Sequence, residues 1–106
     1  MPKYLLEVSY NADGVKGLVK DGGSKRRTVA DTLLQSLGGK IESFYYAFGD
    51  TDVFVIADLP DNGAAAAASL ALAGSGAVTN KITVLLTPAE IDAAVKKSGT
   101  YTPPGR

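Results

Sequence analysis

Any chemistry of this sequence must come from carboxylates, lysine, arginine, tyrosine, serine or threonine, the N-terminus or a borrowed cofactor, because its 106 residues include neither histidine nor cysteine. Without cysteine there can be no disulfide, thiolate nucleophile or cysteine-ligated metal. Without histidine there can be no histidine-based triad and no histidine-ligated metal or haem. A few short segments bring the remaining reactive side chains together, and each is also compatible with a purely structural role.

The segment Gly49–Asp52 (GDTD) holds two carboxylates separated by one residue. Oxygen ligands at this spacing can hold a hard cation such as Mg²⁺. Glycine and aspartate are also typical of turns, because they adopt unusual dihedral angles and cap backbone amides. We expect a hairpin turn here, and we expect the chain to need no metal ion and no other cofactor.

Glu7 belongs to a strand-like segment and falls with Ser9 on the face opposite Leu6 and Val8. A carboxylate buried between two subunits would have a raised pKa and could accept a proton. Tyr45 occupies a period-two position in a later strand-like segment and could add a hydroxyl on the same side. The structural alternative, which we favour, is a Glu7 that is solvated or paired across subunits.

The segment Ser24–Arg27 (SKRR) opens a predicted helix after two glycines, so helix amides and cations there could hold an anion. Its spacing does not match the phosphate-binding pattern GxxxxGK[ST]. A solvated basic turn, with one arginine paired to an acid, is the favoured interpretation.

Two further features have a chemical interpretation. Removal of Met1 would leave Pro2 as an N-terminal secondary amine, which serves as a general base in tautomerases, although the later layout of this chain departs from theirs. The aromatic run Phe44–Phe48 (FYYAF) could stack a flat ligand. Packing in the core or at an interface is the commoner use of such a cluster.

Hydrophobic periodicity and turn residues predict the elements that position these groups. The first part of the chain predicts a strand at Tyr4–Tyr10, a turn at Asn11–Gly14, a short helix at Val15–Lys20 and a helix capped by Ser24 that runs to Leu37, ended by Gly38-Gly39. The second part predicts strands at Lys40–Phe48 and Val53–Leu59, a helix from Pro60–Asn62 to Ala73, a strand at Val78–Leu86, a helix from a capping box at Thr87–Glu90 to Ser98, and an extended tail at Tyr101–Arg106.

The order β-α-β-β-α-β plus a final helix predicts an α+β protein with a ferredoxin-like antiparallel sheet and the main helices on one face. We expect one domain over residues 1–98 and an extended C-terminal tail over residues 99–106. Alternation along the strands leaves apolar side chains on the face without helices. An uncovered apolar face of this size predicts association, so we expect a homodimer or a larger homo-oligomer.

The charge balance argues against polyanionic partners, because lysine plus arginine equals aspartate plus glutamate. Nucleic-acid binding or adsorption to an anionic membrane normally requires a basic excess or a basic face. No stretch supplies the roughly 20 apolar residues of a spanning helix, and the N-terminus has no basic and apolar leader. We therefore expect a cytoplasmic protein with no nucleic-acid partner and no membrane partner.

Three segments, NADGVKGLVKDGGSKRR, LGGKIESFYYAFGDTD and LALAGSGAVTNKITVLLT, carry a resemblance to a known family. In their order and spacing the chain resembles the GYD-domain family over roughly residues 2–95. The resemblance implies a dimeric α/β barrel of ferredoxin-like fold and a largely uncharacterised function. It points to Arg26 and to Asp52, the acid that ends the family's Gly-x-Tyr-Asp motif. Thr51 stands where the family has tyrosine, and Gly76–Thr79 lacks an arginine that similar sequences often have.

These observations predict a small homo-oligomeric domain that binds a small organic ligand with little or no catalysis. The candidate ligand-binding residues are Glu7, Arg26, Tyr45 and Asp52. Dimeric α/β barrels also include cofactor-free oxygenases and isomerases. In that alternative Glu7 or Asp52 would be the base, Tyr45 a hydrogen-bond donor and Arg26 the anion holder. A third alternative is a purely structural assembly module whose barrel is filled by side chains.

Overall fold

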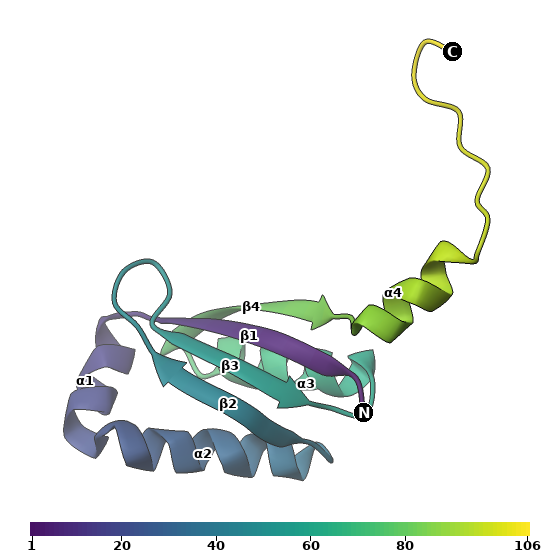
Figure 1. The fold of residues 1–106 in the computed structure, drawn as a ribbon. Coiled ribbons are helices and arrows are strands. Elements are labelled where there is room, and N and C mark those ends of the chain that lie inside the picture. The colour runs from purple at the N-terminus through teal and green to yellow at the C-terminus, as the bar shows by residue number, and fades with distance from the viewer.

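A four-stranded antiparallel sheet with the strand order β2-β3-β1-β4 forms the centre of the molecule. The computed structural model describes residues 1–106 (Figure 1). The strands are β1 (Lys3–Tyr10), β2 (Lys40–Tyr46), β3 (Val53–Asp58) and β4 (Val78–Leu85). Together with four helices they make an α+β protein, and this order agrees with the ferredoxin-like arrangement expected from the sequence.

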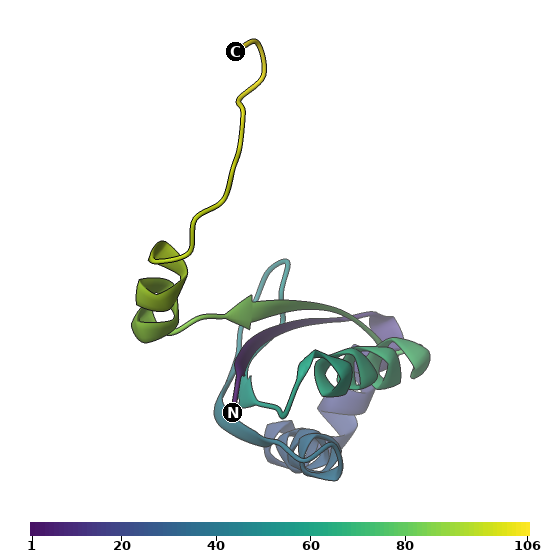
Figure 2. The same cartoon turned by 90° about the vertical axis from the view of Figure 1, so that its right-hand side faces the viewer.

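The two longest helices cover one face of the sheet, and the other face carries no helix (Figures 1 and 2). The helices are α1 (Ala12–Asp21), α2 (Gly23–Ser36), α3 (Asn62–Gly74) and α4 (Pro88–Val95). α2 packs against β2, α3 against β4, and α1 against β1 and α2. We call the face without helices the open face.

The core lies between the sheet and the helices. Alternation on β1 buries Tyr4, Leu6 and Val8, and β3 contributes Val53, Val55 and Ala57. From the helices, Leu34 of α2 and Ala65 and Ala68 of α3 complete this cluster with Leu59. The small alanines let α3 approach the sheet closely. Tyr4 is fully buried, and its hydroxyl donates a hydrogen bond to Asn62 Oδ1 at 2.8 Å.

The first helix begins earlier than the sequence predicts, so the expected turn at Asn11–Gly14 is wrong. Asn11 is instead the N-cap of α1, and its side-chain oxygen accepts a hydrogen bond from the Gly14 amide at 3.0 Å. The same asparagine chemistry that favours turns therefore starts a helix. Ser24 is also not the cap of α2, because that helix begins at Gly23 after Gly22, which has a φ of 82°.

The strand and helix ends otherwise differ by a few residues from the prediction. β2 ends at Tyr46 rather than at Phe48, because Phe48 lies in the connection to β3 and is fully exposed. The predicted stop at Gly38-Gly39 is confirmed: Gly38 has a φ of 82°, and the Gly39 amide donates to the Leu34 carbonyl at 2.9 Å. A β-bulge between Ile41 and Ser43 shifts the register of β2 against β3.

The C-terminal part extends away from the sheet (Figures 1 and 2). The predicted capping box is present, since Thr87 and Glu90 exchange side-chain-to-backbone hydrogen bonds, but α4 ends at Val95 rather than near Ser98. No residue of α4 is buried, and Ile91 and Val95 are exposed. None of the helices combines the length and the apolar character required to cross a membrane.

Candidate functional site

The sheet separates the candidate residues predicted from the sequence into three places. Glu7 and Tyr45 lie on the open face, because Glu7 alternates with the buried Leu6 and Val8 of β1. Arg26 lies on the helix side, at the edge of an apolar cavity. Asp52 lies where the β2–β3 connection meets the end of β1. The fold therefore brings Glu7 and Tyr45 into one region and leaves the other two apart from them.

Glu7 and Tyr45 share one row of side chains across the open face. In the sheet register Tyr45 of β2 pairs with Phe54 of β3, Phe54 pairs with Glu7 of β1, and Glu7 pairs with Lys81 of β4. The aromatic pair stands exposed in the single chain, with Tyr45 71% and Phe54 37% accessible. Glu7 therefore lies between Lys81 and the ring of Phe54, an arrangement that suits an ion pair of Glu7 with Lys81 beside an apolar patch.

Asp52 is bonded to the backbone of the neighbouring strands. Its carboxylate oxygen Oδ2 accepts a hydrogen bond from the Tyr10 amide at 2.8 Å. Its own amide donates to the Val8 carbonyl at 2.9 Å, and its carbonyl accepts from the Ala47 amide at 2.8 Å. The first two contacts extend the pairing of β1 with β3, and the third closes the hairpin between β2 and β3. No group of three acidic side chains that could hold a metal ion occurs in the chain.

Replacing Asp52 with alanine is expected to lower the free energy of unfolding by about 2 kcal/mol, because the part-buried Tyr10 amide loses its charged acceptor. Asp50→Ala is the matched control, since the Asp50 residue is exposed and contributes only its backbone carbonyl, which accepts from the Ser9 hydroxyl. Urea unfolding of both variants measures the difference. Equal stability of the two variants would contradict this structural role of Asp52.

A hydrophobic cavity lies between the sheet and the helices α2 and α3. Its inner part has a volume of about 100 Å³, and twelve of the thirteen residues that line it are hydrophobic. A second, outer hollow of about 380 Å³ continues toward α1. The two hollows share the residues Tyr10, Arg26, Val29, Leu33, Leu72 and Val78. From α3, Leu72 lines both parts and Ala71 lines the outer one.

Arg26 is the one charged residue in the lining of the inner hollow. It lies on α2 with Val29, Ala30 and Leu33, at the helical spacing i, i+3, i+4 and i+7 that puts all four on one face. Its side chain is 37% exposed, and its nearest acidic partner is Asp21, 3.6 Å from Nη1 to Oδ2. The guanidinium is therefore at the mouth of the cavity, with only a long contact to an acid.

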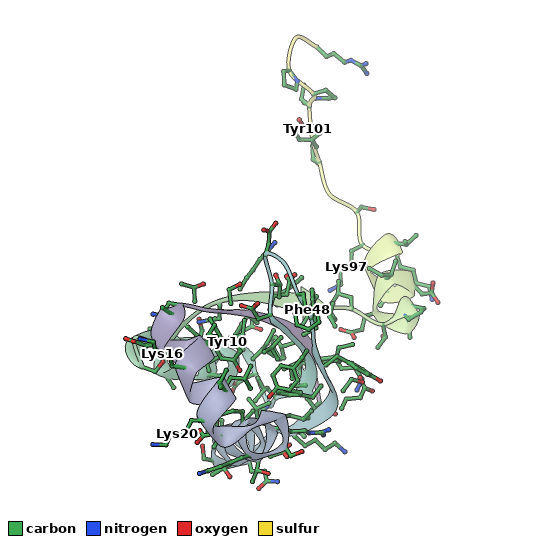
Figure 3. All side chains as sticks on the ribbon, turned by 90° about the vertical axis from the view of Figure 1, so that its left-hand side faces the viewer. Tyr10, Lys16, Lys20, Phe48, Lys97 and Tyr101 are labelled. Carbon is green, nitrogen blue, oxygen red and sulfur yellow. The ribbon has the colours of Figure 1, made fainter.

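Two tyrosines stand close to Arg26. Figure 3 shows Tyr10 beneath the sheet at the α1 end of the molecule. Burial raises the pKa of Tyr10, with a smaller contribution from Tyr46, whereas the charge of Arg26 opposes the shift. Burial also raises the pKa of Tyr46, whose hydroxyl donates to the Gly23 carbonyl at 2.9 Å. Both hydroxyls therefore stay protonated at neutral pH and act as hydrogen-bond donors.

Sequence reasoning identified Arg26 and missed the cavity around it. A signal for it was present in α2, where Arg26 stands at the N-terminal end of an apolar stripe formed by Val29, Ala30 and Leu33. No local pattern could have placed Tyr10 and Tyr46 beside Arg26, because they come from β1 and β2, which do not pair with each other in the sheet.

A separate charged cluster occupies the other end of the open face. Lys3 Nζ lies 2.8 Å from Asp58 Oδ1 and 3.1 Å from Glu42 Oε1. The hydrogen bond from Lys3 holds the pKa of Asp58 below its usual range, and the bonds to Asp58 and Glu42 raise the pKa of Lys3. Since Glu42 is the bulge residue of β2, this cluster ties the bulge to β1 and β3, with two carboxylates sharing one ammonium group.

The comparisons with known proteins agree with the resemblance seen in the sequence. The family model described as the GYD domain matches residues 4–95, which run from β1 to the last residue of α4. No curated protein and no solved structure matches this chain.

Proposed function

The chain belongs to the GYD domain family, and we propose that it works as a homodimer in which each subunit binds a small organic molecule in the cavity between the sheet and α2. The observation that carries the proposal is the cavity itself. It is concave, almost wholly apolar and bordered by a few polar groups at its mouth. Binding sites for small molecules generally have this composition.

The open face supports the dimer. Its apolar side chains, Leu5, Phe54, Ile56 and Leu85, line up in the rows that alternate with the buried rows of the sheet. A domain of this size buries a limited share of its surface alone, so pairing two open faces would add apolar burial. α4 supports the same conclusion, because a helix of eight residues with no buried side chain gains little stability from this chain alone.

The geometry favours binding over the oxygenase or isomerase alternative. Glu7, the proposed base of that alternative, lies on the open face, whereas the cavity is on the helix side. The carboxylate of Asp52 bonds to the Tyr10 amide, and the two tyrosines near the cavity stay protonated. The cavity therefore offers hydrogen-bond donors and a cation, but no free base in its inner part.

A methyl NMR titration with naphthamide, a neutral and largely apolar probe, tests where a ligand binds. We expect the methyl signals of Leu33, Leu34, Val53 and Val55 to shift, because these residues line the inner cavity. Shifts confined to Leu5, Ile56 and Leu85 would place binding on the open face and contradict the proposed site. An absence of shifts would contradict ligand binding in the cavity.

A cavity-filling variant sharpens this test. Ala30→Phe adds a ring at a lining position of α2 and is expected to weaken naphthamide binding by about tenfold or more, because the ring takes the ligand's place. Gln35→Phe is the matched control, since Gln35 lies exposed on the same helix and outside the cavity lining. Equal affinity of the two variants would contradict the proposed site.

A further inference from the structure

We infer that the ligand of the cavity is an apolar monoanion, with a ring or short chain in the inner hollow and a carboxylate that meets Arg26 and Tyr10 at its mouth. The inference rests on the proposed function and adds the chemical class of the ligand. It follows from the way one cation is placed against an otherwise apolar lining.

The guanidinium of Arg26 makes only a long contact with an acidic side chain of the protein. Its contact with Asp21 is 3.6 Å long, and the same carboxylate also faces Lys25 Nζ at 3.6 Å. Two cations therefore share one acid, through contacts longer than the charge-assisted hydrogen bonds that arginine makes with carboxylates. About one positive charge therefore remains unbalanced, and the planar fork of N–H donors on Arg26 is available to a ligand.

Tyr10 supplies a second donor at the same place. It borders both the inner and the outer hollow, as Arg26 does. Its hydroxyl bonds to Tyr46 in the free chain and is neutral at neutral pH, so it can turn from Tyr46 to an anion without repelling the anion. An arginine fork and a phenolic hydroxyl together suit a planar carboxylate with two oxygens.

The other residues that line the cavity restrict the polarity and the charge of the ligand. Apart from Arg26 and the Tyr10 hydroxyl, the inner hollow presents only apolar side chains, so the buried part of the ligand must be apolar. Asp13 lines the outer hollow, is exposed, and does not border the inner one. With a single excess cation and an acid on the outer rim, the site favours one negative charge over a phosphate dianion.

Calorimetric titration with naphthoate and naphthamide, which share a shape and differ in charge, tests this inference on the full chain. The wild-type protein is expected to bind naphthoate about tenfold more tightly than naphthamide, the scale of one charge-assisted hydrogen bond. Arg26→Gln should remove that preference, because it lowers the affinity for naphthoate about tenfold more than the affinity for naphthamide. Lys25→Gln, which removes a neighbouring charge beside the same Asp21, should leave both affinities within about twofold of the wild type.

If the wild type binds both probes with equal affinity, the inference is overturned, although the cavity is still a binding site. This comparison requires no variant. The inference is also overturned if Arg26→Gln loses affinity for both probes equally, or if Lys25→Gln loses the preference for naphthoate. If neither probe binds the wild type, the proposed function fails together with the inference.

Discussion

Phe54→Lys is expected to convert the proposed homodimer to a monomer at micromolar concentration. Phe54 lies between Tyr45 and Glu7 in the middle of the open face, where the pairing of two sheets would bury its ring. Full burial of a phenylalanine contributes about 1.5–3 kcal/mol, so burying the 37% of Phe54 that is exposed contributes roughly a third of that, and a two-fold interface loses it twice. A lysine at the same position would in addition bring two like charges together, so the dimer dissociation constant should rise at least about a hundredfold.

Sedimentation equilibrium of the wild type and the variant measures this change. Leu70→Lys is the matched control, because Leu70 is a 74% exposed apolar residue on α3, on the helix side of the sheet. The control should remain dimeric. A Phe54→Lys protein that associates as strongly as the control would show that the open face is not the interface.

Gly39→Ala is expected to lower the free energy of unfolding by about 3 kcal/mol, at the upper end of the usual cost of overpacking. A Cβ at Gly39 would overlap the backbone carbonyl of Asp58 and would lie 2.6 Å from the Cδ2 atom of the fully buried Leu59. A backbone atom cannot rotate aside as a side chain can, so β2 would have to move away from β3. The contact lies at the start of the strand pair that begins with Lys40 and Asp58.

Gly74→Ala provides the control for this prediction. Gly74 is the last residue of α3, and a Cβ there would meet no atom within 4 Å. Alanine should therefore be neutral or stabilise by up to about 1 kcal/mol. Urea unfolding of the two variants compares them directly. A Gly39→Ala protein as stable as the Gly74→Ala protein would contradict the close approach of β2 to β3.

Much of the fold could be predicted, because burial follows a period of two along the strands. The alternation of Tyr4, Leu6 and Val8 fixed both the buried face of β1 and the position of Glu7 on the other face. The capping box at Thr87 was equally clear, since its two hydrogen bonds are local. Asn11 was misinterpreted as a turn because an asparagine side chain accepts hydrogen bonds from nearby downstream amides both in turns and at a helix N-cap.

The site was less predictable, because it depends on contacts between distant segments. Arg26 could be identified from the basic segment SKRR and the family resemblance, whereas the space beside it depends on how α2 and the sheet pack together. The acceptor role of Asp52 toward the Tyr10 amide joins residues 42 positions apart. Glu7 and Tyr45 share a row only through the register of β1, β3 and β2, and the bulge between Ile41 and Ser43 alters that register.

Native mass spectrometry of untagged, gently purified protein tests the central proposal most directly. We predict a species of twice the 10.9-kDa chain mass that carries up to one small additional mass per subunit. That additional mass should be absent after denaturation, and its value gives the bound molecule. A monomer at micromolar concentration with no additional mass, before and after denaturation, would contradict both the pairing of the open faces and the binding of a ligand in the cavity.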